Sequence, residues 1–158
     1  MRFFKTLFLI LFLAGIYNVS LAQSKKNTKK SISKFKPPKL ISTLSNYKDS
    51  AIVTGGEAEN IVALPLMVTD DKKNIYAIAS YQFLYQKNVV TENEETGKVS
   101  ATTSTFADRF KASPLPEQWI NKVREEIKTG EILYFFDIIV KDAQGRVMYA
   151  PPVKITIQ

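Results

Sequence analysis

The last six residues of the chain, Val153 to Gln158, alternate strictly between apolar and polar side chains. A period of two places every second side chain on one face, so this segment predicts a β-strand with one buried face. Residues 131–141 form the most apolar of the expected strands. Between these strands Asp142 and Gly145 mark a tight turn, because Asp bonds to the following backbone and Gly adopts positive φ. The chain is therefore expected to end in a sheet.

The same pattern continues upstream, where most segments are short and strand-like. We expect a strand over 51–56 that ends in a double-glycine turn at Gly55 and Gly56, and an edge strand over 60–68, because Pro65 cannot donate to a central ladder. Residues 75–86 alternate with both faces partly covered, and 89–105 predict a long hairpin with a charged tip at Glu92 to Lys98.

One segment carries a helical period. Pro116 suits the first turn of a helix and Gly130 suits its end, so we expect a short helix at about 115–128. Its apolar face is Trp119, Ile120, Val123 and Ile127. With about seven strands and one short helix, the predicted fold is mainly β, an immunoglobulin-like antiparallel β-sandwich.

The N-terminal residues resemble an export signal. A positive start precedes an apolar run of 11 residues, Leu7 to Tyr17, which is short of the about 20 residues that span a membrane. We therefore expect a signal peptide over 1–22, cut between Ala22 and Gln23. An uncleaved anchor is the alternative. Cleavage would leave no transmembrane segment. The expected location is the periplasm, either free or associated with the outer membrane.

Charge is distributed unevenly along the chain. Of the 22 Lys and Arg residues, two precede residue 23 and seven lie in residues 23–39, where there is no acid. Residues 40–158 then hold 13 basic against 15 acidic residues, a net charge of −2. We expect 23–39 to be a flexible basic leader, either a solvated spacer or a segment drawn to anionic surfaces. The β domain, over 40–158, is not a nucleic-acid-binding domain by charge.

The sequence holds no His and no Cys. It therefore lacks Ser-His and Cys-His nucleophiles, the usual zinc ligand sets and any disulfide framework. Ser31 and Lys34 have the spacing of a Ser–Lys dyad but lie in the leader, where nothing would hold their geometry. We predict no catalytic residue, no cofactor and no metal site, and hence no enzyme.

Several other residues have a chemical and a structural interpretation, and the structural one is favoured for each. The acidic side chains of the hairpin tip and of the helix are expected to be solvated. Trp119 is expected to lie in the core rather than in a binding site. Asp137, a charge inside an apolar strand, must be solvated or hydrogen-bonded, because an unpaired buried carboxylate is costly.

Residues 50–158 resemble a known family. The motifs are "VTGGEAENI", the helix and strand "WINKVREEIKTGEILYFFDIIVKDAQGRV" with its K-x-G-E lead-in at Lys128 to Glu131, and the closing "APPVKITIQ". In this order they are similar to the C-terminal domain of GldM/PorM, the gliding-motility and type IX secretion motor proteins of Bacteroidota. The resemblance implies an immunoglobulin-like sandwich in the periplasm that contacts outer-membrane ring components. The motor proteins' membrane helix and long helical first domain have no counterpart here, so a role in carrying torque is not expected.

Two functions follow as hypotheses. The first is an exported protein-interaction module, an accessory of type IX secretion or gliding, which binds through a sheet edge or through loops. The alternative is a periplasmic or secreted module that binds a small ligand or glycan, and it requires a concave site lined by exposed aromatics. Three or more exposed tyrosines on one face would favour the alternative; the candidates are Tyr76, Tyr81, Tyr85, Tyr134 and Tyr149.

Overall fold

A computed structural model describes residues 35–158, which contain nine strands and two helices. The predicted signal peptide, its cleavage site at Ala22 and Gln23, and most of the basic leader lie outside the described residues. The strands are β1 (Leu40–Leu44), β2 (Tyr47–Lys48), β3 (Ser50–Val53), β4 (Leu66–Asp70), β5 (Ala77–Glu92), β6 (Val99–Phe110), β7 (Ile132–Lys141), β8 (Val147–Ala150) and β9 (Val153–Ile157). The helices are α2 (Gly55–Ile61) and α3 (Glu117–Glu126).

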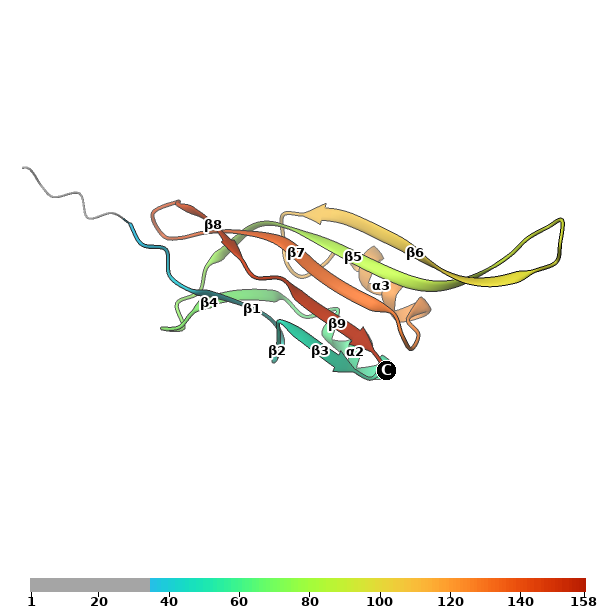
Figure 1. Ribbon diagram of the computed structural model, residues 1–158. Coiled ribbons are helices and arrows are strands. Elements are labelled where there is room, and N and C mark those ends of the chain that lie inside the picture. Colours follow the sequence, from blue (N-terminus) through green and yellow to red (C-terminus); the bar gives the residue numbers. More distant parts are fainter. Residues whose placement is uncertain (1–34) are drawn as a thin grey trace, which may run out of the picture. The chain divides into compact units, whose positions relative to one another are not determined.

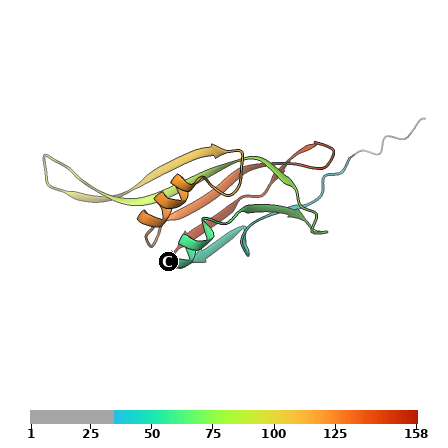
Figure 2. The same ribbon diagram turned by 180° about the vertical axis from the view of Figure 1, so that it is seen from behind.

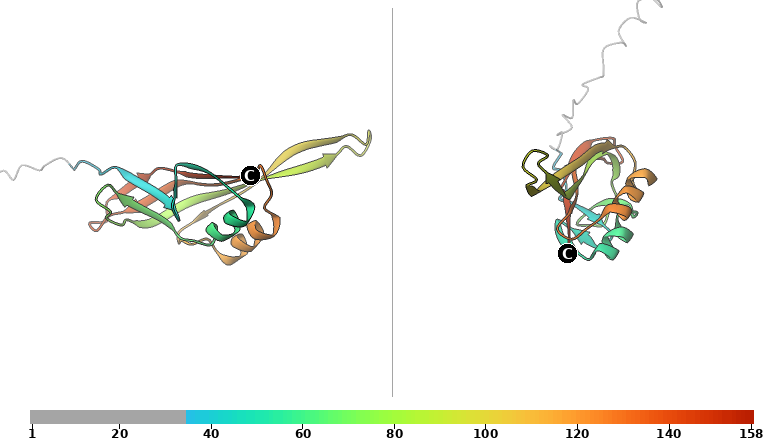
Figure 3. Two further views of the ribbon diagram at one scale, coloured as in Figure 1. Left: turned by 90° about the horizontal axis from the view of Figure 1, so that it is seen from below. Right: turned by 90° about the vertical axis from the view of Figure 1, so that its right-hand side faces the viewer.

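The strands form two sheets (Figure 1). The large sheet has the order β3-β9-β7-β5-β6, and β8 pairs with β7 beyond the start of β9. The small sheet has the order β2-β1-β4. Both helices and the small sheet lie on the same side of the large sheet (Figures 2 and 3). The predicted fold class, a mainly β sandwich, is confirmed; the strand count is nine rather than about seven, and β3 and β9 run parallel within an otherwise antiparallel large sheet.

The core lies between these layers. Strands β5, β7 and β9 each turn one face toward it, as their alternating burial shows. Aromatic rings dominate its centre: Phe83 packs on Phe135 with ring centroids 4.8 Å apart and meets Trp119 of α3 edge-on at 5.7 Å. Trp119 is therefore packed against the core, as the helical spacing predicted. The buried side chains of these three strands are Tyr81, Phe83, Tyr85, Leu133, Phe135, Ile138, Val140, Val153, Ile155 and Ile157.

A β-bulge at Asp137 shifts the alternation of β7. Phe135 and Ile138 both face the core although they are three residues apart, and the register with β5 shifts at this point. Asp137 supplies the extra residue, with φ of 49°. Its carboxylate is exposed, accepts a bond from the Gln82 side-chain amide at 2.7 Å and pairs with Arg109 at 3.3 Å. Asp137 is thus both solvated and hydrogen-bonded, and it has a structural role.

The largest difference from the sequence-based prediction is helix α2. Gly55 and Gly56 begin this helix rather than forming a turn, and the expected strand over 60–68 is split into the end of α2 and strand β4. The local cause is Thr54, whose hydroxyl caps the helix by accepting from the N–H of Glu57 at 3.3 Å. This spacing matches a capping box. The Glu57 carboxylate accepts the Tyr47 hydroxyl instead of returning to the cap.

Gly130 and Gly145 both have positive φ, at 86° and 77°. The Asp142 carboxylate accepts bonds from the N–H groups of Gln144 and Arg146, each at 2.9 Å, and so holds the β7–β8 turn. Helix α3 begins at Glu117 and ends at Glu126, inside the range expected for it; Gly130 does not end the helix but lies beyond it, in the turn before β7.

Candidate interaction surface: the free edge of the large sheet

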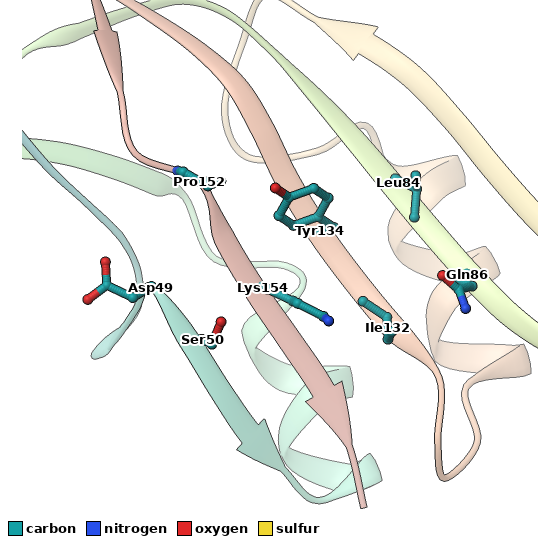
Figure 4. Close-up of a pocket in the computed structure, with 8 residues that line it drawn as sticks. All are labelled: Asp49, Ser50, Leu84, Gln86, Ile132, Tyr134, Pro152 and Lys154. Carbon is teal, nitrogen blue, oxygen red and sulfur yellow. The ribbon is translucent and has the colours of Figure 1, made fainter.

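The outer face of the large sheet carries an open hollow. It measures about 410 Å³ and is lined by Asp49, Ser50, Leu84, Gln86, Ile132, Tyr134, Pro152 and Lys154. Figure 4 shows that the Asp49 carboxylate points away from the Lys154 ammonium. The hollow is open to solvent, and its two charged groups do not converge. Its shape and chemistry therefore suit contact rather than acid–base work.

The one fully buried carboxylate of residues 35–158 belongs to Glu131. It accepts the Tyr85 hydroxyl at 2.5 Å and the backbone N–H groups of Lys128 at 3.0 Å and Asn88 at 3.2 Å. Burial raises the pKa of the Tyr85 phenol, and the bond to Glu131 raises this pKa further. Because its partners are backbone groups and a protonated phenol, this cluster fixes the start of β7 to β5 and has no free reactive group.

A second polar cluster lies in the loop after β4. Asp70 accepts bonds from the N–H of Lys72, the N–H and side-chain amide of Asn74, and the Tyr76 hydroxyl, at 2.8–3.1 Å. The amide of Asn74 is the main reason that the pKa of Asp70 is lowered. Every contact serves the turn itself. This cluster is therefore a structural loop, not a ligand site.

Strand β6 is the end strand of the large sheet and has no strand partner on its other side within residues 35–158. Its backbone orientation follows from two bonds. Asn93 N–H donates to the Lys98 carbonyl at 3.0 Å, so this pair is a hydrogen-bonded one. Bonded pairs alternate along an antiparallel ladder, so the odd-numbered residues of β6 direct their N–H and C=O groups away from β5. The contacts of Asn88, which lies opposite Thr103, are consistent with this assignment. Its N–H donates to the Glu131 carboxylate and not to β6, so Asn88 and Thr103 are not a hydrogen-bonded pair.

This free edge lacks the usual protection. Exposed edges are normally blunted by charged side chains, prolines or bulges. Residues 99–107 contain no charged residue and no proline, and their pairing with β5 runs without a register shift. Lys98 and Asp108 stand just outside this segment. The edge is therefore a continuous row of unpaired backbone donors and acceptors.

The outer part of the β5–β6 hairpin has no third strand. β7 pairs with β5 only as far as Gln86, whereas β5 continues to Glu92 and β6 starts at Val99. We call residues 87–104 the ribbon; it extends beyond the end of β7 (Figures 1 and 3). Val90 and Val99 on it are 71% and 60% exposed. A two-stranded ribbon is marginally stable alone, so it gains from a further strand.

The sequence predicts the hairpin but does not by itself show which of its strands has a free edge. The signal was present in the uncharged, β-branched run over 99–107. Among the tyrosines, Tyr81 and Tyr85 are buried, Tyr76 and Tyr134 are half-buried, and Tyr149 is exposed. One exposed tyrosine falls short of the three that would favour ligand binding.

Comparison with known proteins adds no family assignment. No protein-family model matches the sequence, and a search of curated proteins finds no match. In the described part of the chain, no helix has the length and apolar character needed to cross a membrane. Nor do three or more acidic side chains gather there as metal ligands.

Proposed function

We propose that this chain is an exported, non-catalytic protein-interaction module that binds by accepting a strand at the free edge of β6. The observation that carries the proposal is the unprotected edge over residues 99–107, where alternate backbone groups face outward. In strand addition, main-chain hydrogen bonds supply affinity and the neighbouring side chains supply specificity. The chain's chemistry supports this reading, because the hollow holds no convergent ionisable groups.

The resemblance to the GldM/PorM C-terminal domain suggests where the module works. We propose the periplasm as its location and an outer-membrane ring component of type IX secretion as its partner. The export signal predicted over 1–22 supports the location. The shared K-x-G-E motif corresponds here to Glu131 and its buried bonds, which are structural and do not themselves select a partner.

Substitution of Thr103 tests the edge directly. Its N–H faces away from β5, so Thr103→Pro removes one outward donor and adds a ring at the edge, and leaves the bonds to β5 in place. Thr103→Val is the matched control, because it keeps the donor and suits a strand. Tagged protein would be crosslinked in living cells and recovered from the envelope. We expect the wild type and Thr103→Val to capture the same protein and Thr103→Pro to lose it.

Two results would count against the proposal. One is recovery of no envelope protein above background with the wild type. The other is equal capture by all three variants, which would move the contact away from this edge. Circular dichroism and urea unfolding of Thr103→Pro establish that a loss of capture is not a loss of fold.

One observation favours the alternative, a ligand- or glycan-binding module. Tyr134 and Phe136 stack on the outer face with ring centroids 5.0 Å apart and planes 8° from parallel, and Tyr134 lines the hollow. Phe136 supports one face of the Tyr134 ring, and an aromatic ring at a hollow suits the apolar face of a sugar ring. Titration of oligosaccharides against the wild type and Tyr134→Ala tests this: binding that Tyr134→Ala abolishes would establish the alternative.

A further inference from the structure

We infer that the free edge of β6 pairs with the same edge of a second copy, antiparallel, with Thr103 opposite Thr103. This inference rests on the proposed function, since it names the strand that the edge accepts when no other partner holds it. The two sheets would then join in the order β5-β6-β6-β5. Pairing with a second copy and pairing with another protein would exclude one another, because both use the outward groups of the same residues.

The ribbon gives the first reason. Its strands lack a third strand within residues 35–158, and its two valines, Val90 and Val99, are largely exposed. In the antiparallel arrangement, residues 99–102 of one copy lie opposite residues 104–107 of the other. The β6 strand of each ribbon therefore pairs with the part of β6 in the other copy that follows Thr103. Each ribbon thus gains the third strand that it lacks.

The charges select the register. Lys98 stands five residues before Thr103 and Asp108 five residues after it. With Thr103 on the two-fold axis, Lys98 of one copy faces Asp108 of the other, twice per dimer. Opposite charges directly across an antiparallel pair stabilise it, and like charges destabilise it. Both side chains are exposed, and no charged residue lies between them.

The alternation of outward-facing backbone groups along β6 agrees with this register. Odd-numbered residues of β6 face outward, so bonds between copies require odd residues opposite odd residues. Thr103 opposite Thr103 fulfils this, and so do Ala101 opposite Thr105 and Val99 opposite Ala107. The last pair also places the exposed Val99 beside an apolar side chain. Backbone, apolar and charged groups therefore select the same register.

Cysteine crosslinking tests the register without competing disulfides from native residues, because the chain holds no cysteine. Across the proposed axis the two Thr103 Cα atoms would lie about 5.5 Å apart, within reach of a disulfide. Two Thr105 Cα atoms would lie about 14 Å apart, out of reach. We expect Thr103→Cys to form a disulfide-linked dimer under mild oxidation and Thr105→Cys to remain monomeric on denaturing gels. Mixing Ala101→Cys with Thr105→Cys should give the mixed dimer.

Charge reversal provides an independent measurement by sedimentation of the purified protein over a range of concentrations. We expect Lys98→Asp to raise the dimer dissociation constant about tenfold or more, since two cross-strand pairs change from attraction to repulsion. Asp108→Lys should do the same, and the double variant should restore the dimer. Lys48→Asp, an exposed reversal on β2, is the control and should have no effect.

The outcomes separate this inference from the proposed function. A protein that stays monomeric at high concentration, or equal crosslinking of Thr103→Cys and Thr105→Cys, overturns the second-copy pairing. If Thr103→Pro then still loses its envelope partner, the proposed function stands without the dimer. If the dimer forms in this register, Thr103→Pro should abolish it as well.

Discussion

The body of the sandwich and the ribbon differ in how they are held. In the body, each strand of the large sheet packs one face on the aromatic core, and Tyr81, Phe83 and Tyr85 of β5 are fully buried. Further along the same strand, in the ribbon, Val90 is exposed and the only neighbour is β6. One strand thus passes from the buried core to an exposed two-stranded segment.

This contrast separates stability from binding. Apolar burial supplies most of the folding free energy, so the body should determine whether the chain folds. Regions with few buried contacts open easily and are suited to binding. Substitutions in the ribbon and along the β6 edge should therefore have little effect on folding stability but should weaken binding.

The largest expected effect is in the body, where two adjacent phenylalanines provide a matched pair. Phe135 is buried against Tyr81 and Phe83, whereas Phe136 lies on the outer face beside Tyr134. We expect Phe135→Ala to lower the free energy of unfolding by about 3–5 kcal/mol, and Phe136→Ala by about 1 kcal/mol. Urea unfolding measures both. Equal losses would mean that the outer face is covered in solution.

The second effect concerns Glu131, which joins the base of the ribbon to the body. Glu131→Ala leaves two backbone donors and the Tyr85 hydroxyl unsatisfied in a buried place, so we expect a loss of about 3 kcal/mol. Glu126→Ala is the comparison; it removes partly exposed ion pairs to Lys87 and Lys122 and should cost about 1 kcal/mol or less. The same unfolding measurement applies, and a neutral Glu131→Ala would contradict the assigned role.

Two glycines give the third test, with effects of opposite sign. Gly130 has φ of 86°, and a Cβ there would lie 2.8 Å from the side-chain amide nitrogen of Asn88. Gly130→Ala should therefore cost about 1–2 kcal/mol. Gly56 lies in helix α2 with open space where its Cβ would be, so Gly56→Ala should raise stability by about 0.5–1 kcal/mol. Thermal unfolding distinguishes the signs.

The smallest expected effect is a pH dependence from Asp70. The Asn74 amide, followed by its other donors, holds the pKa of Asp70 below its usual value. A folded-state pKa that is lowered contributes stability above the unfolded pKa of about 3.9, and this contribution is lost as the pH falls through the folded value. The unfolding midpoint of the Asp70→Asn variant should therefore depend less on pH between about pH 5 and pH 2 than that of the wild type. An unchanged acid slope would show that Asp70 does not titrate with folding.

The sequence predicted the parts of the fold in which local and tertiary signals agree. The alternation of Val153 to Ile157 and the helical spacing of α3 reflect burial on one face, and both elements are found. Helix α2 was missed because two glycines favour a turn and outweighed the Thr54 cap and the packing of Ala58 and Ile61. The bulge at Asp137 was not predicted either, since its positive φ depends on pairing with β5.

The edge of β6 was harder to predict than the strand itself. A run of β-branched and small residues indicates a strand, but its place in the sheet depends on which strands pair. Only the sheet order shows that residues 99–107 border solvent on one side. The parallel pairing of β3 with β9 is a similar case, since it joins segments about one hundred residues apart in the sequence.

Amide hydrogen exchange, resolved by residue with NMR spectroscopy, tests the central claim most directly. In the unbound monomer, Ala101, Thr103 and Thr105 should exchange fast because their N–H groups face solvent, and Thr102 and Ser104, bonded to β5, should exchange more slowly. On binding, by a partner or by a second copy, protection should rise at the odd-numbered residues alone. A rise confined to the outer face around Tyr134, or no rise along β6 in a saturated complex, would contradict the claim that this edge is where the protein binds.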